Sequence, residues 1–170
     1  YVESDPTAPL GAYGRTKLAG EQAIERWTDD YVIARTAWLF GWPGKSFPDT
    51  MLRAGAERGE VSVVTDQVGS PTWTGHLSEA LVQLASSEIV GIVHTAGSGR
   101  CSWHELTVEL YRQAGLEQVV VHETDSGEFK RPAPRPAWSV LATERAGEGA
   151  PVLPDWREGV SGYLAERSQS

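Results

Sequence analysis

Helical segments and short strands alternate along this sequence, and no other feature constrains its fold as strongly. Amphipathic or capped segments predict five helices, and short β-rich runs between them predict four strands. Alternation of this kind predicts an α/β protein. The expected helices span residues 12–28, 48–58, 74–87, 103–115 and 156–166, and the expected strands span residues 31–35, 61–64, 91–94 and 119–121.

Single residues mark several ends of these elements. Ser102 and Glu105 have the spacing of a capping box, in which each residue satisfies a backbone amide of the other at the start of a helix. Gly59 is expected to end the second helix, and Asp155 is expected to cap the last one. Residues 130–136 contain three prolines, so no regular structure is expected there.

The charge and the cysteine content exclude several classes of protein. The chain carries a net charge of −8 at pH 7, and an acidic surface opposes binding to a nucleic-acid polymer or an anionic membrane. No apolar run reaches the roughly 18 residues of a transmembrane helix, and no signal-peptide pattern opens the chain. Cys101 is the only cysteine, which excludes an intrachain disulfide and a cysteine-cluster metal site. We therefore expect a cytoplasmic protein.

The sharpest chemical feature is the spacing Tyr13-x-x-x-Lys17 at the start of the first expected helix. Residues four positions apart share one face of a helix, so the ammonium group lies beside the phenol. A neighbouring cation favours the phenolate, and such a tyrosine can give a proton to a carbonyl oxygen or take one from an alcohol. The spacing alone also fits an ordinary pair of surface residues, and both interpretations stay open at this point.

The surrounding sequence resembles that of the extended short-chain dehydrogenases/reductases. Residues 9–21 are similar to the active-site segment of this family, and residues 34–41 are similar to its strand and turn beside the nicotinamide. Residues 65–72 resemble the signature Asp-Gln-x-Gly-Ser-Pro-Thr of one branch, the dTDP-4-dehydrorhamnose reductases. Later blocks of that branch follow in the same order, at residues 91–97, at Ser102 and Trp103, and at residues 135–141.

This resemblance implies a reaction and a role for two residues of the helix. NADPH or NADH would reduce dTDP-4-dehydro-L-rhamnose to dTDP-L-rhamnose, with the dTDP-sugar as the substrate. Tyr13 would protonate the C4 keto oxygen, and Lys17 would stabilise the phenolate and bind the nicotinamide ribose. Both residues therefore count as catalytic and as cofactor-binding. The resemblance allows Mg²⁺, but nothing in the sequence indicates it.

Trp38 matches the tryptophan through which these reductases contact the sugar nucleotide. The face of an indole suits the apolar face of a deoxysugar, so the resemblance implies a substrate-binding role. The alternative is a core tryptophan that follows a strand. The turn with Asp66, Gln67, Ser70 and Thr72 is interpreted as structural, with binding as the alternative.

The family's Gly-rich pyrophosphate-binding turn has no counterpart in this sequence. We therefore expect the C-terminal part of a Rossmann-type reductase, without its N-terminal dinucleotide-binding half and inactive alone. Residues 1–40 would be the catalytic helix and following strand of the Rossmann domain. Residues 41–170 would be mainly the substrate-binding region, with strand 91–94 returning to the Rossmann sheet. Strands 31–35 and 91–94 would then lack sheet neighbours and promote association; a homodimer also stays open.

Two other functions remain as alternatives. Another extended short-chain enzyme, such as a sugar-nucleotide epimerase or dehydratase, would keep its NAD bound and return the hydride. A non-catalytic regulatory subunit would share the fold, as the regulatory subunit of methionine adenosyltransferase does. The basic cluster Lys130, Arg131 and Arg135 would meet a nucleotide diphosphate or only neutralise nearby acids. The four histidines lack the spacing of metal ligands.

Overall fold

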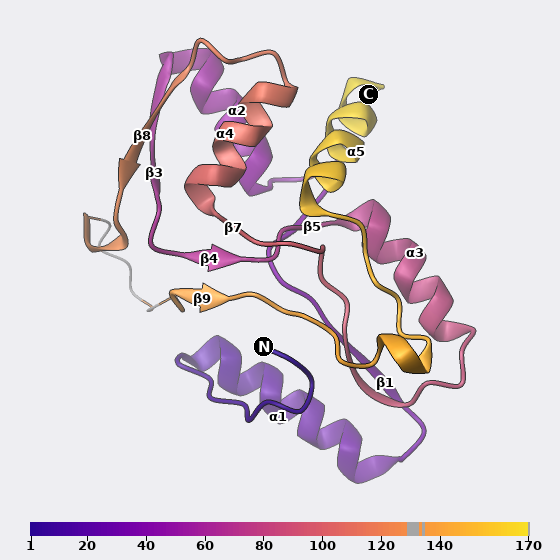
Figure 1. The fold of residues 1–170 in the computed structure, drawn as a ribbon. Helices are drawn as coiled ribbons and strands as arrows, with labels where there is room; N and C mark the ends of the chain where they lie inside the picture. The colour runs from indigo at the N-terminus through magenta and orange to yellow at the C-terminus, as the bar shows by residue number, and fades with distance from the viewer. Residues whose placement is uncertain (129–132, 134, 170) are drawn as a thin grey trace.

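The structure, a computed structural model, describes residues 1–128, 133 and 135–169. Helices and short strands alternate along these residues, as Figure 1 shows, so the expected α/β class is confirmed. The helices are α1 (Ala12–Trp27), α2 (Phe47–Arg58), α3 (Thr74–Ala85), α4 (Trp103–Gln113) and α5 (Trp156–Ser168), and the strands are β1 (Val32–Arg35), β2 (Leu39–Phe40), β3 (Glu60–Val64), β4 (Val68–Gly69), β5 (Thr72–Trp73), β6 (Gly91–His94), β7 (Cys101–Ser102), β8 (Val120–Thr124) and β9 (Trp138–Ser139).

The expected helix ends are confirmed in their hydrogen bonds. Ser102 Oγ accepts from the backbone of Glu105, and the Glu105 carboxylate accepts from the backbone of Ser102, which completes the capping box of α4. The Asp155 carboxylate accepts from the backbone of Arg157 at the start of α5. Gly59 ends α2 with a φ of 73°, a left-handed conformation that glycine adopts without steric cost.

Four small sheets connect segments that are distant in the sequence. β1 pairs in parallel with β6, β2 with β5, and β3 with β8, while β4 lies between β7 and β9. The expectation that strands 31–35 and 91–94 both lack sheet neighbours is wrong, because they pair with each other from Val32↔Gly91 to Arg35↔His94. Within the described residues their outer edges remain unpaired.

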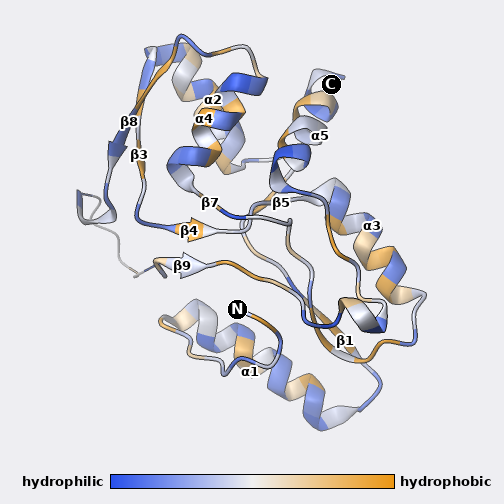
Figure 2. Ribbon diagram, viewed as in Figure 1, coloured by the Kyte–Doolittle hydropathy of each residue, from blue (hydrophilic) through white to orange (hydrophobic). Residues whose placement is uncertain are grey.

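Two hydrophobic clusters hold the elements together. The larger one lies where α2, α4 and α5 meet β3, and its fully buried members include Leu110, Val160 and Tyr163. The smaller one joins α3 to the β1–β6 pair through Leu84 and Val93. Figure 2 shows apolar residues along β1 and on α3, which agrees with this second cluster.

Helix α1 lies at the edge of the molecule, beside the first residues of the chain (Figure 1). Its apolar stripe has the expected helical spacing, but none of its residues is buried. Ile24 is 44% exposed and Trp27 is 88% exposed. Periodicity identifies the apolar face of a helix but says nothing about what covers it; the described elements cover the face of α1 only in part.

Candidate active site: a cleft beside helix α1

A cleft of about 1020 Å³ lies between α1 and the chain that follows β1. Further wall residues come from residues 1–2 and 5–11 and from residues 133, 135, 136, 138, 139 and 141. Tyr13, Lys17 and Trp38 all line this cleft. The three residues that the sequence singled out are therefore brought to one site, although Trp38 comes from a different element.

Tyr13 and Lys17 stand on the first two turns of α1, one turn apart on the same helix face. The side chain of Tyr13 is 78% exposed, so its hydroxyl is accessible to a molecule in the cleft. Gly14 lies against Pro9 so closely that a Cβ at position 14 would come within 2.9 Å of the Pro9 Cβ. This close approach keeps the loop before α1 beside the tyrosine.

An ion pair holds α1 to the neighbouring strand. Arg35, the last residue of β1, donates from Nη2 to Glu21 at 2.6 Å and from Nε at 3.0 Å. Hydrogen bonding to Glu21 raises the pKa of Arg35, and both side chains are largely buried. A bidentate ion pair of this kind adds geometric specificity as well as interaction energy. It holds in place the helix that carries Tyr13 and Lys17.

Two buried polar atoms at the bottom of the cleft have no partner among the described residues. One is Thr36 Oγ1, directly after β1, and the other is His94 Nε2, at the end of β6. His94 Nδ1 lies 3.0 Å from the carbonyl of Ala142, which can only accept, so Nδ1 donates. Thr36 Oγ1 and His94 Nε2 are both closed off from solvent, so a molecule in the cleft does not reach them in this structure, and neither carries a role in the candidate site.

Glu3 connects the start of the chain to the loop after β9. Its carboxylate accepts hydrogen bonds from Thr143 Oγ1 at 2.7 Å and from the backbone amides of His94 and Glu144, at 2.8 and 3.0 Å. Burial alone would raise the pKa of Glu3, but these hydrogen bonds outweigh it and lower the pKa to about 2. The contact spans about 140 positions in the sequence, so spacing could not predict it.

Trp38 lies between β1 and β2 and has a φ of 45°, a left-handed conformation that is rare for a bulky residue. Its carbonyl accepts from the backbone of Thr72 at 3.2 Å. Its indole stacks on Trp103, with the ring centres 3.6 Å apart and the planes 5° apart. One face of the indole is therefore already covered by the protein.

The side chains of the turn at residues 65–72 make hydrogen bonds within the protein. Thr72 Oγ1 accepts from the backbone of Gly97 at 3.0 Å, and Ser70 Oγ accepts from the backbone of Leu141 at 3.2 Å. Both hydroxyls are fully buried, while exposed Asp66 holds the backbone of Ser126. These contacts favour the structural interpretation of the turn. Arg135 lines the cleft, whereas Lys130 and Arg131 lie outside the described residues.

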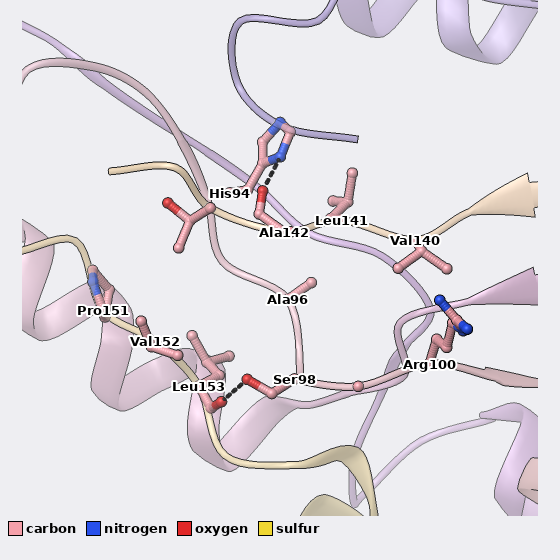
Figure 3. A pocket seen from close by; sticks show the side chains of 12 residues that line it. His94, Ala96, Ser98, Arg100, Val140, Leu141, Ala142, Pro151, Val152 and Leu153 are labelled. Atoms are coloured by element: carbon pink, nitrogen blue, oxygen red, sulfur yellow. Dashed lines mark hydrogen bonds between the residues drawn. The ribbon is translucent and has the colours of Figure 1, made fainter. Parts of the chain in front are cut away.

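A second cavity, of about 410 Å³, adjoins the cleft at His94 (Figure 3). Its visible polar contacts run within the protein: His94 to the carbonyl of Ala142, and Ser98 to the carbonyl of Leu153. The residues proposed for catalysis or binding, Tyr13, Lys17 and Trp38, do not line this second cavity. This cavity therefore adds nothing to the candidate active site.

Other kinds of site find little support in the described part of the chain. No group of three or more His, Cys, Asp or Glu side chains there is placed to hold a metal ion. Cys101 is buried, and that burial raises the pKa of its thiol, which disfavours a nucleophilic thiolate. Among the described helices, none combines the length and the apolar character needed to cross a membrane.

Comparisons with protein families and curated proteins agree with one another. The model of the RmlD substrate-binding domain matches residues 1–169. A probable dTDP-4,6-dihydroxy-2-methyloxan-3-one 4-ketoreductase of Streptomyces antibioticus is 43% identical over 92% of this chain and 54% of its own length. A dTDP-4-dehydrorhamnose reductase of Mycolicibacterium smegmatis is 40% identical over 97% of this chain and 51% of its own length. The chain thus spans about half the length of these relatives.

Solved structures lead to the same group of proteins. A dTDP-4-dehydrorhamnose reductase of Bacillus anthracis, in complex with NADP, superposes with a TM-score of 0.93 at 36% identity. That match covers 98% of this chain and 59% of the other. A UDP-N-acetylglucosamine 4-epimerase of Methanobrevibacter ruminantium superposes with a TM-score of 0.77 at 16% identity, over 99% of this chain and 57% of the other, which shows a shared fold alone.

Proposed function

We propose, because this chain belongs to the RmlD substrate-binding domain family, that it supplies the catalytic helix and the substrate-binding region of an NAD(P)H-dependent oxidoreductase. The reaction is the reduction of dTDP-4-dehydro-L-rhamnose to dTDP-L-rhamnose. The observation that carries the proposal is the cleft in which Tyr13 and Lys17 of α1 meet Trp38 of the following loop. Relatives named dTDP-4-dehydrorhamnose reductase support the choice of substrate.

The cleft residues divide the chemistry among them. A bound nicotinamide would supply the hydride for the C4 carbon of the sugar. Tyr13 gives its phenolic proton to the C4 oxygen, and the ammonium of Lys17 stabilises the phenolate that remains. Lys17 would also donate a hydrogen bond to the nicotinamide ribose. The exposed hydroxyl of Tyr13 and the shared helix face are consistent with these roles.

The cofactor of this proposed reaction is NADPH or NADH, which would supply the hydride. NADP in the Bacillus anthracis relative supports this assignment. No Gly-rich turn of this sequence can hold the pyrophosphate, so we assign that task to a dinucleotide-binding half outside these residues. Residues 1–40 then belong to the Rossmann domain and strand 91–94 returns to its sheet, an assignment supported by the parallel β1–β6 pair. We place the enzyme in the cytoplasm; a homodimer stays a prediction.

A substitution at Tyr13 tests the reductase proposal. The assay follows NADPH oxidation with dTDP-4-dehydro-L-rhamnose, by a polypeptide that joins this chain to a dinucleotide-binding half of the same family. Tyr13→Phe removes the proton donor and is expected to lower kcat at least about 100-fold. Tyr31→Phe, which removes a hydroxyl outside the cleft, is the matched control and should retain full activity.

Two outcomes of this assay would contradict the proposal. Equal rates for Tyr13→Phe and the unsubstituted enzyme would remove the role of Tyr13. A bound cofactor that converts a sugar nucleotide without net consumption of NADPH would instead identify an epimerase or dehydratase.

A further inference from the structure

Trp38 is held in an uncommon backbone conformation by its surroundings. A φ of 45° is rare for a bulky side chain, and such conformations persist where neighbouring structure over-determines them. The backbone on either side is fixed: Arg35 closes β1, and Leu39 pairs with Thr72 in the β2–β5 sheet. The indole must therefore leave the chain in a set direction.

The indole occupies a slot with two walls. Trp103 forms one wall, in parallel stacking at 3.6 Å. Gly69 forms the other: a Cβ there would lie 2.6 Å from Trp38 Nε1 and 2.7 Å from Cζ2, and nearer still to Cε2, the atom between them. A Cβ that approached within the plane of the indole would lie nearer to Nε1 and Cζ2 than to Cε2. The observed order is the reverse, so Gly69 lies over the face of the ring. Since Trp103 occupies one face, Gly69 covers the opposite one.

Paired strands set the width of this slot. β4 and β7 are antiparallel neighbours in which Gly69 pairs with Cys101 and Val68 pairs with Ser102. Trp103 follows directly as the first residue of α4, where the Ser102–Glu105 capping box fixes its position. Phe47 packs on Trp103 with a centroid distance of 4.4 Å and supports that wall.

We propose that Gly69 and Trp103 are positioning residues that clamp Trp38 between them, so that the indole meets the sugar nucleotide with its edge. This inference rests on the proposed function, in which Trp38 contacts the substrate. With both faces covered, the indole cannot lie flat on the deoxysugar, as the resemblance had implied. The indole instead forms a rigid edge of the cleft. Because Gly69 has no side chain, the indole can lie against the backbone there, and this contact sets its position.

The slot itself is tested by NMR on this chain, without any enzyme assay. The indole N–H signal of Trp38 is identified by its loss in Trp38→Phe. Stacking on Trp103 shifts that signal through the ring current of the neighbouring indole. We expect Trp103→Leu to remove the shift and Trp103→Phe to restore part of it. A Trp38 signal that stays in place in a folded Trp103→Leu chain would overturn the slot.

The positioning role is tested by kinetics on the joined polypeptide described above. Gly69→Ala forces the indole out of its slot, and Trp103→Leu lets it tilt. Each is expected to raise KM for the dTDP-sugar about tenfold or more, with a smaller effect on kcat, and Trp103→Phe should recover most of the loss. Gly147→Ala is the matched control, since a Cβ there meets no atom within 4 Å.

The outcomes separate this inference from the proposed function. If the unsubstituted polypeptide turns over and Gly69→Ala leaves KM unchanged, the positioning role is overturned while the reductase stands. If the unsubstituted polypeptide does not reduce the dTDP-sugar at all, the proposed function fails, and the NMR result alone then supports or overturns the slot.

Discussion

At the scale of single residues, the candidate site combines side chains that differ in how visible they are from the sequence. Tyr13 and Lys17 lie one helical turn apart, so their shared face follows from spacing alone. Trp38 could be placed in the site only through a resemblance to known reductases. Glu3 takes part through hydrogen bonds with distant segments, which a linear pattern does not contain.

Glu3 makes the first prediction at this scale, a pH dependence of stability. Its folded pKa of about 2 lies below its ordinary value of 4.5. Its hydrogen bonds therefore stabilise the fold fully above pH 4.5, and this contribution disappears as the pH falls towards 2. Glu3→Gln should lower the free energy of unfolding at pH 7 by about 1–2 kcal/mol, after allowance for solvent screening. It should have little effect near pH 2.

Urea unfolding at a series of pH values checks this prediction. Glu57→Gln removes an exposed carboxylate of α2 whose side chain makes no comparable contacts, and it serves as the control. A Glu3→Gln curve parallel to that of the unsubstituted chain between pH 2 and 5 would show that the Glu3 hydrogen bonds carry no such stability.

At the scale of elements, the sequence predicted every long helix and its type. Capping residues and glycine stops are local signals, which is why α2, α4 and α5 begin and end close to where they were expected. The short strands β2, β4, β5 and β7 were missed, because two-residue strands have no periodicity and exist only through their partners. The pairing of β1 with β6 was not foreseen for the same reason.

The attachment of α1 gives a prediction at this scale. No residue of α1 is buried, so the helix depends on a few contacts such as the Glu21–Arg35 ion pair. Glu21→Gln should increase amide hydrogen exchange in α1 by roughly three- to tenfold, corresponding to about 1 kcal/mol, and leave α4 unchanged. Hydrogen exchange followed by mass spectrometry measures both helices in one experiment.

Glu25→Gln is the matched control for the Glu21 substitution. Glu25 lies one turn further along α1. It attracts Arg35 electrostatically from beyond ion-pair distance and accepts a 3.5 Å hydrogen bond from the Tyr31 hydroxyl. Faster exchange of equal size in both variants would mean that lost helix charge, and not the lost ion pair, loosens α1.

At the scale of the whole molecule, the proposed function would give the chain one side of an active site more completely than the other. The substrate side has two packed clusters and a rigid slot for Trp38. The cofactor side has an exposed Tyr13, an uncovered α1 and unpaired outer edges of β1 and β6 among the described residues. The lack of a Gly-rich turn is a local signal that can be read directly from the sequence, and the missing dinucleotide-binding half that it indicates stays a prediction.

This imbalance leads to a prediction about the isolated chain. The 170 residues alone should show no NADPH oxidation with dTDP-4-dehydro-L-rhamnose, because backbone amides at a helix start normally hold the cofactor pyrophosphate. The joined polypeptide should restore turnover in the same absorbance assay at 340 nm. Measurable turnover by the chain alone would show that the cleft binds the dinucleotide without that turn.

The Glu3 hydrogen bonds have a consequence for the timing of synthesis. Their acceptor belongs to the third residue of this sequence and two of their donors to positions 143 and 144. A ribosome makes the helix that carries Tyr13 more than a hundred residues before those donors emerge. The wall of the cleft can therefore close only late in translation, shortly before α5, which completes the larger hydrophobic cluster, is made. Until then, Tyr13 lies in a cleft whose wall is incomplete.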